Sequence, residues 1–307
     1  MSFEEHLVIS DHQTEYFETS LARLTLVDLL GEIGQLLQCT RTLPSLMPLK
    51  TLRLTTWEYW HMDDFLSLLA NLQRIIAANK DSCRLVTLEI TNYTGSGYSP
   101  VTLYNPTFVT PGFYVLVLEP LKGILGSTLS TLRLDPLIDM EFCSDFLVIF
   151  LAAKNLQYLS VGSNAARLVH PTSLITIDSV VTFIGDMPYL EHLLIPWTIE
   201  TRLSEVPDAV ASPASSSSSS EVNHEVNHVI NPNLRSLGYP YGYGLDTEAI
   251  TSVLEVLDSV LPSLTHLLIF SCYIDDWNDS LYDIGHAVNF SLESFHVVYE
   301  DDVHSHL

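Results

Sequence analysis

The stretch TEAITSVLEVLDSVLPSLTHLLIF, residues 247–270, contains a helix pattern, a turn and a strand pattern in succession. Its first part carries apolar residues at helical spacing on one face, behind the candidate N-cap Thr247: Ile250, Val253, Leu254, Leu257 and Leu261. Pro262 ends that helix, because proline restricts the preceding residue to extended conformations. In the following hexamer, Leu264-x-x-Leu267-x-Ile269, the last two apolar residues point to the same side of a strand.

This hexamer, apolar-x-x-apolar-x-apolar, occurs nine times in order along the chain. The copies begin at Leu21, Leu49, Leu85, Leu129, Leu156, Leu190, Leu234, Leu264 and Leu292. Helical patterns lie between them, at Asp28–Gln38, Asp63–Asn79, Met140–Ala153, Ser173–Gly185, Thr247–Leu261 and Asp276–Asn289. Stacking such units pairs the strands in parallel and buries their apolar rows against the helices. The predicted fold class is therefore an α/β solenoid, a horseshoe with a parallel sheet on the concave face and helices on the convex face.

The hexamers also predict the core. We expect these residues to be buried: Leu52, Leu54, Leu88, Leu132, Leu159, Leu193, Leu237, Leu267 and Phe295. The first hexamer, Leu21 to Leu26, could instead belong to a capping helix.

The repeats resemble the leucine-rich-repeat superfamily over residues 21–300. The Asn or Cys that commonly follows the hexamer in that superfamily is mostly absent, and the repeats are long and irregular. In this they resemble the repeat regions of fungal F-box proteins, which are similar to substrate receptors of cullin-type ubiquitin ligases. The resemblance implies a protein-binding role. The family's F-box usually starts with Leu-Pro-x-Glu, whereas Leu43-Pro44 is followed here by Ser45-Leu46, and we find no F-box.

Composition divides the chain into a segment or cap at residues 1–20 and a solenoid at residues 21–307 with two interruptions. The first, residues 91–118, contains no Asp, Glu, Lys or Arg. The second, residues 204–231, centres on the run Ser215 to Ser220, and we expect residues 207–228 to be disordered and removable. His224 and His228 in this insert have the i, i+4 spacing of a metal pair, but a polar linker is the favoured interpretation because no third ligand is near.

Charge and hydropathy exclude several classes of function. The chain holds 37 acidic and 13 basic residues, a net charge of −24, and residues 168–307 contain 20 acids against two arginines. Such a field repels phosphate backbones, so we expect no nucleic-acid binding, whereas a basic protein partner is permitted. The longest apolar run, Phe146 to Ala153, is far shorter than the about 20 residues of a membrane span. We expect no membrane association and a cytoplasmic or nuclear location.

We find no catalytic, nucleotide-binding or zinc-protease motif, so we expect no enzyme activity, no cofactor and no metal. The acidic pairs Asp63-Asp64 and Asp275-Asp276 could bind a metal, but Asp63, Asp275 and Asp276 lie where helices are expected to begin, and there they are interpreted as favouring the helix dipole.

A binding surface is predicted on the solvent side of the strands. Apolar and His residues occupy solvent-facing strand positions in the C-terminal half, and aromatic residues follow the same strands. The predicted protein-binding residues are His192, Leu194, Trp197, Tyr241, His266, Leu268, Phe270 and Tyr273. Alternatively, the aromatic residues cap the core beneath each loop, or the Ser-rich insert or C-terminal tail covers the patch. The leading hypothesis is a protein-interaction scaffold, the substrate-binding part of a ubiquitin-ligase receptor that lacks its F-box. The alternative is a stand-alone acidic inhibitor or regulator of a basic protein.

Overall fold

The structure of the 307-residue chain is a computed structural model. It describes residues 7–8, 26–43, 49–56, 62–78, 85–92, 120–126, 128–134, 143–161, 174–195, 197–200, 231–240, 247–271 and 294–299. All structural statements below concern these residues.

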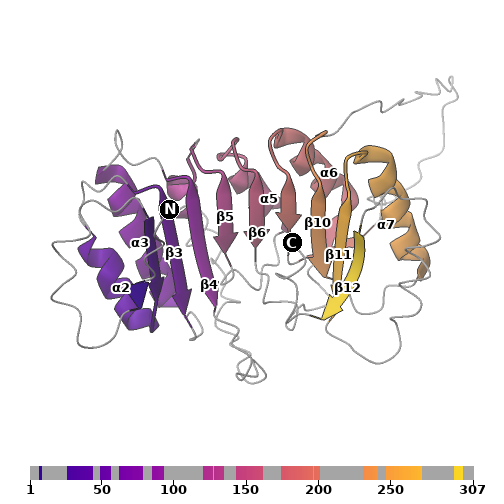
Figure 1. Cartoon of the computed structure of the whole chain (residues 1–307). Coiled ribbons are helices and arrows are strands. Elements are labelled where there is room, and N and C mark those ends of the chain that lie inside the picture. The colour runs from indigo at the N-terminus through magenta and orange to yellow at the C-terminus, as the bar shows by residue number, and fades with distance from the viewer. Residues whose placement is uncertain are drawn as a thin grey trace, which may run out of the picture.

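The described residues form an α/β fold around a ten-stranded parallel sheet, in the order β1-β2-β3-β4-β5-β6-β8-β10-β11-β12 (Figure 1). The strands are β1 (Leu7–Val8), β2 (Leu26–Leu30), β3 (Thr51–Thr56), β4 (Thr87–Asn92), β5 (Thr131–Leu134), β6 (Tyr158–Val161), β8 (His192–Leu194), β10 (Ser236–Pro240), β11 (His266–Ser271) and β12 (Ser294–Tyr299). Each strand therefore pairs with the strand of the next unit along the chain. The eight hexamers from Leu49 onward supply β3 to β6, β8 and β10 to β12.

Register explains why the hexamers form one core. Leu52, Leu88, Leu132 and Leu159 are successive partners across β3 to β6, and Leu193, Leu237 and Leu267 continue the same row. All seven are at most 1% exposed. A second row, which runs from Leu54 through Ile90, Leu134 and Val161 to Tyr239 and Ile269, is also buried. The predicted core is thus confirmed, except at Phe295, whose side chain is not described.

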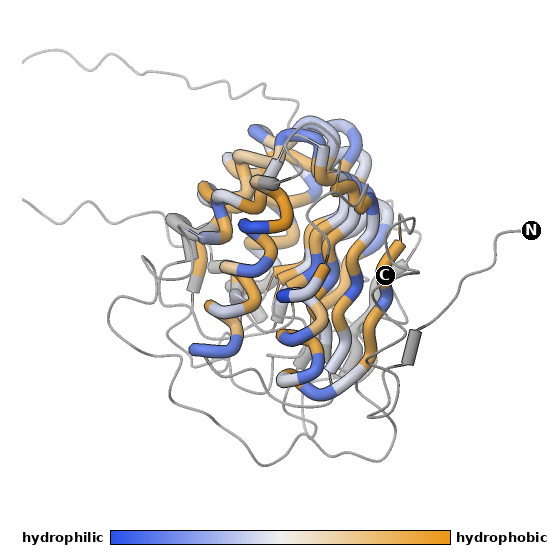
Figure 2. The backbone as a smooth tube through the Cα atoms, turned by 90° about the vertical axis from the view of Figure 1, so that its left-hand side faces the viewer, coloured by the Kyte–Doolittle hydropathy of each residue, from blue (hydrophilic) through white to orange (hydrophobic). Residues whose placement is uncertain are grey.

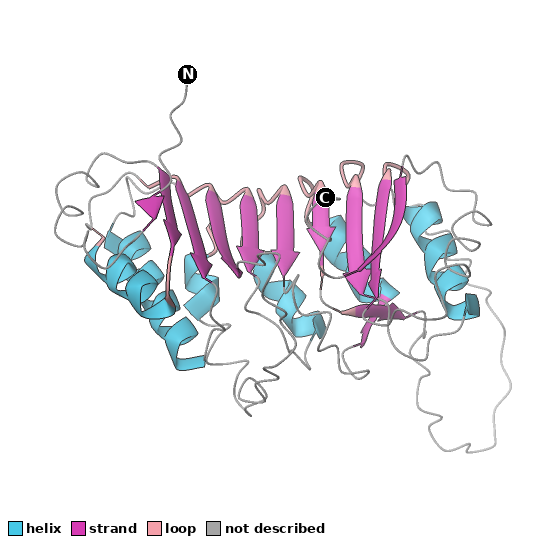
Figure 3. Cartoon of the chain, turned by 60° about the horizontal axis from the view of Figure 1, so that its bottom comes forward, coloured by secondary structure: helices cyan, strands magenta, loops and turns pink. Residues whose placement is uncertain are grey.

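The described helices all lie on one side of the sheet (Figures 1 and 3). They are α2 (Ile33–Thr42), α3 (Met62–Ala78), α5 (Cys143–Phe150), α6 (Ile177–Asp186) and α7 (Thr247–Val260), and residues 120–124 form a further helical turn. Seen along the sheet, apolar and polar positions alternate on the strands (Figure 2). We call the side covered by these helices the helix face and the opposite side the open face. No described helix or strand covers the open face.

A small parallel sheet of β7 (Leu174–Thr176) and β9 (Thr198–Glu200) adds to the helix face, where β9 contacts α7. The turn before β10 is held by Asn231, which adopts a positive φ of 30°. Its buried amide nitrogen donates to Met187 O at 2.8 Å and Leu190 O at 3.0 Å. Asn231, expected at the end of the Ser-rich insert, is therefore part of the ordered turn, and Thr91, expected to open the uncharged loop, lies in β4.

Two predictions of element boundaries are wrong. Strand β2 uses Val27 and Leu29 as its core positions, since they pair with Leu52 and Leu54, and Leu26 lies on the open face. The core positions are therefore three residues later than the first hexamer predicts. Both Leu24/Leu26 and Val27/Leu29 have the spacing of core positions, and only pairing with β3 selects the second pair. As a result, Asp28 lies in a strand, and helix α2 starts at Ile33. Likewise, Leu174–Thr176 forms β7, and α6 starts at Ile177.

Several predictions fall outside the described residues. They are the hexamer residues Leu21 and Leu24, the helix Asp276–Asn289, the disorder of residues 207–228, and the pair His224 and His228.

Candidate functional site

The open face carries the residues that alternate with the core positions. Its middle row follows directly from the strand register and crosses nine strands. The row consists of Asp28, Arg53, Glu89, Arg133, Ser160, Leu194, Gly238, Leu268 and His296. It changes character between β5 and β6. The four residues up to Arg133 are partly exposed, and the four from Ser160 to Leu268 are buried.

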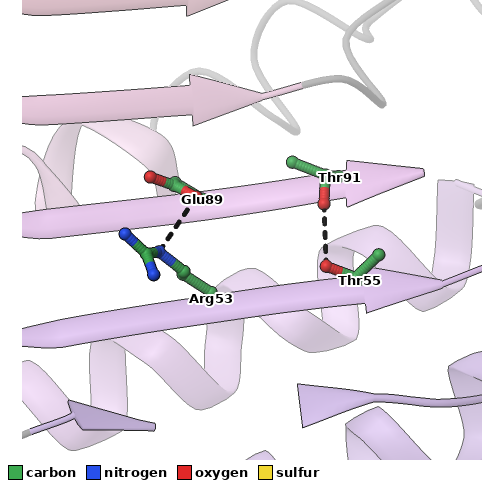
Figure 4. A network of polar contacts seen from close by, with 4 residues as sticks. All are labelled: Arg53, Thr55, Glu89 and Thr91. Carbon is green, nitrogen blue, oxygen red and sulfur yellow. Dashed lines mark hydrogen bonds and ion pairs between the residues drawn. The ribbon is translucent and has the colours of Figure 1, made fainter. Parts of the chain in front are cut away.

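The first four residues alternate in charge across β2 to β5, and we call Asp28, Arg53, Glu89 and Arg133 the charge ladder. Arg53 Nε lies 3.2 Å from Glu89 Oε2, and these side chains are 38% and 23% exposed. Two residues further along the same strands, the Thr55 and Thr91 hydroxyls share a hydrogen bond of 2.9 Å (Figure 4). On the other flank, Thr51, Thr87 and Thr131 form a row. Apart from Leu26 and Leu30 on β2, this part of the open face is polar, and it is mostly accessible and balanced in charge.

From β8 to β11 the middle row has no polar side chain and is tightly packed. Leu194 and Leu268 are 1% and 3% exposed, yet neither belongs to the hydrophobic cluster on the helix face. Gly238 lies between them in the register, and a Cβ at that position would overlap Leu194 Cδ1. The missing side chain of Gly238 therefore provides the space that Leu194 fills.

Two buried polar atoms lie where the two parts of the row meet. Ser160 Oγ and His192 Nδ1 have no hydrogen-bond partner among the described residues. Ser160 is in register with Arg133 on one side and Leu194 on the other, and the His192 ring lies 5.8 Å from the Tyr158 ring. Buried polar atoms without partners are costly, so this junction is where a bound group could form new hydrogen bonds.

Burial lowers the pKa of His192. Glu191 opposes that effect, and His266 and Arg235 add to it by charge repulsion. His192 and His266 lie on the same row, separated by Ser236. These effects together favour the neutral form of the His192 imidazole, in which one nitrogen donates and the other accepts.

The structure brings His192, Leu194, His266 and Leu268 together on β8 and β11, as the sequence predicts. The expectation that Leu194 and Leu268 are exposed is wrong, however, because both are buried. Trp197 is 1% exposed and belongs to the core cluster, so it caps the core in this structure. Phe270 lies in β11, but its side chain is not described, and Tyr241 and Tyr273 lie outside the described residues. A role of these residues in binding stays a prediction.

Metal or membrane sites are not found among the described residues. No group of three or more His, Cys, Asp or Glu is placed to hold an ion there. No described helix is long and apolar enough to cross a bilayer.

Comparison with known proteins yields little. No family model matches the chain, and no curated protein is significantly similar to it. Among solved structures, the chain is similar to one described as the crystal structure of the Rad7 and Elc1 complex in yeast, with 13% identity, 89% of this chain and 82% of that chain covered, and a TM-score of 0.22. A score this low supports no conclusion about fold or function.

The charge ladder is the feature that sequence analysis missed. Aligning the hexamers places Arg53, Glu89 and Arg133 in one column, so the signal was present for three of its members. Because Asp28 was expected in a helix, the sequence did not show the fourth member of the ladder or the alternation of charge across all four strands.

Proposed function

We propose that this chain is a leucine-rich-repeat horseshoe and acts as a protein-interaction scaffold that binds a partner protein on its open face. One observation carries the proposal: strands in one unbroken parallel register present a side that no described element covers. Burial requires apolar residues in the core rows. The open-face row, by contrast, changes from charged residues to leucines along the sheet, although the strand register stays the same. Such variation suits a surface that recognises a partner.

Curvature supports the horseshoe. Neighbouring strands lie about 4.8 Å apart, whereas packed helices need about 8–10 Å. Because strands and helices alternate along the chain, a stack of these units is wider on the helix face and bends with the sheet inside. The open face is then concave.

The resemblance of the repeats to those of fungal F-box proteins supports a narrower role. The chain would bind the substrate of a cullin-type ubiquitin ligase, with recruitment provided by another segment or subunit. It would act in the cytoplasm or nucleus through protein contacts alone, without catalytic chemistry, cofactor or metal.

Site-specific photo-crosslinking tests the scaffold. A crosslinking amino acid replaces Thr131 on the open face, and a matched variant carries it at Ala70, an exposed position of α3. We expect defined protein crosslinks from position 131 in cell extract and none of the same proteins from position 70. Identical products from both positions would contradict binding at the open face. A ligase adaptor among the captured proteins would support the receptor role.

The charge balance favours a second function, an acidic regulator of a basic protein. Residues 168–307 carry 20 acids against Arg202 and Arg235. Binding steered by this charge should weaken steeply with salt, because screening shortens the reach of the field to about 8 Å at physiological ionic strength. The charge ladder has no net charge, so binding through the open face should depend less on salt. A salt titration of the crosslinking yield therefore separates the two functions.

A further inference from the structure

Strand β12 forms one edge of the main sheet. It pairs with β11 alone, whereas every strand from β2 to β11 has two neighbours (Figure 1). The pairing with β11 runs over all six residues of the strand, from Ser294 to Tyr299. The strand at the opposite edge, β1, has only two residues. Among the described residues, β12 is therefore the long unpaired edge of the sheet.

Strand register shows which backbone groups of β12 point away from the sheet. At the start of β4 to β6, β8, β10 and β11, the first residue donates its N–H to the carbonyl that precedes its register partner, as His266 N does to Arg235 O at 2.9 Å. The same pattern directs the backbone of Ser294 toward β11. Backbone groups of successive strand residues point to opposite edges, so the outward N–H and C=O groups belong to Phe295, Val297 and Tyr299.

The sequence of β12 lacks the features that keep an edge strand from pairing. Natural edges are protected by short length, proline or charged side chains. The sequence Ser-Phe-His-Val-Val-Tyr contains no proline, lysine, arginine or carboxylate, and phenylalanine, valine and tyrosine have high β-propensity. The edge is therefore suited to accept a further strand.

We propose that β12 binds an extended segment of a basic protein, which adds a further strand to the sheet. Main-chain hydrogen bonds to the outward groups supply the affinity in this mode of binding. By register, Phe295 and Val297 continue the core rows of Leu267 and Ile269. The added strand should therefore carry apolar residues on the helix face and polar residues on the open face.

Charge selects the partner. Glu293 directly precedes β12, and three acidic residues, 300–302, directly follow it. An antiparallel second copy would bring Glu293 of one chain beside residues 300–302 of the other, and like charges would oppose that pairing. A strand with lysine or arginine at its ends is attracted instead. This inference goes beyond the proposed function, since the edge and the open face are separate surfaces and either can bind without the other.

A designed peptide tests the edge. It alternates valine and threonine over the length of β12 and carries a pair of lysines at each end. We expect the labelled peptide to bind the full chain, as measured by fluorescence anisotropy. Hydrogen exchange should show the amides of Phe295, Val297 and Tyr299 unprotected in the chain alone and protected by the peptide. Two control peptides should not bind: one with glutamate in place of lysine, and one with proline in place of the central valine.

Variants of the chain separate the backbone from the side chains. Val297→Pro removes an outward N–H and keeps the bonds to β11, so the dissociation constant of the peptide should rise by about tenfold or more. Val297→Ala is the matched control, because it also changes the side chain but keeps the N–H, and it should bind as the wild type. D301N/D302N should raise the constant by about threefold at low salt. E255Q/D258N removes the same charge from exposed positions of α7 and should not.

Four results would overturn the proposal: a lysine-flanked peptide that does not bind, outward amides that are already protected in the chain alone, equal binding of the glutamate-flanked peptide, or wild-type binding by folded Val297→Pro. Circular dichroism reports folding. If Val297→Pro does not fold, the proline-containing peptide decides, because its binding as tightly as the parent peptide would exclude main-chain pairing. None of these results bears on the crosslinking test of the open face.

Discussion

The open face of β2 to β5 and that of β6 to β11 rest on the same core rows but differ in almost every other property. The first part carries the charge ladder and two sets of threonines, which are polar and mostly accessible, with Leu26 and Leu30 at its edge on β2. The second part carries Ser160, Leu194, Gly238 and Leu268, all buried. The core positions beneath are leucine, isoleucine or valine with few exceptions in both parts. The comparison separates positions that the fold requires from positions that are free to differ.

The largest expected effect is a loss of stability from changes in the core row that the two parts share. Leu193→Asp and Leu132→Asp each place a charge without a partner in the continuous core row, one under each part. Both should destabilise the fold by about 3 kcal/mol or more, and by similar amounts. Thermal and urea unfolding followed by circular dichroism measures this. A wild-type melting curve for either variant would show that the row is not one shared core.

The next effect sharpens the difference between the parts. Leu194→Ala removes a buried side chain from the middle row and should cost about 2–3 kcal/mol. Glu89→Ala, in the same row, removes a partly exposed ion pair with Arg53 and should cost at most about 1 kcal/mol. The same unfolding experiment compares them. Equal costs would mean that burial does not distinguish the two parts.

A smaller effect concerns Gly238. Gly238→Ala adds a Cβ that overlaps Leu194 Cδ1, and the displaced leucine should lower stability by about 1–2 kcal/mol. In a Leu194→Ala background the overlapping atom is gone, so the same change should cost less. This double-mutant cycle isolates the contact between the two residues. Additive costs would indicate that Gly238 is needed for its backbone alone.

The smallest effect is the pH dependence of His192. Burial lowers its pKa in the folded chain, so the unfolded chain takes up a proton first as the pH falls. His192 therefore contributes stability above its ordinary pKa of 6.5, and this contribution is lost as the pH falls through the lower folded value. His192→Gln should flatten the decline in melting temperature between roughly pH 7 and pH 5. An unchanged decline would assign the acid sensitivity to other groups.

The sequence by itself determined the repeating unit, the parallel pairing and the core. Leucine at fixed spacing within each hexamer is enough for this, because burial acts on every repeat in the same way. It also placed Arg53, Glu89 and Arg133 on the open side, since alternate residues of a strand point to opposite faces.

Tertiary structure alone decided which residues of β2 face the core and which residues of the open face are buried. Near Leu26 the sequence offers two possible pairs of core positions. Only hydrogen bonding to β3 selects Val27 and Leu29, and this choice places Asp28 in the charge ladder. Burial of Leu194 and Leu268 could not be read from their positions, because a residue on the open face is exposed or covered according to its neighbours across strands. Gly238 shows the reason most directly: the space that Leu194 fills belongs to another strand, 44 residues away in the sequence. Periodicity fixes which side a residue is on, and packing between distant segments decides what it meets there.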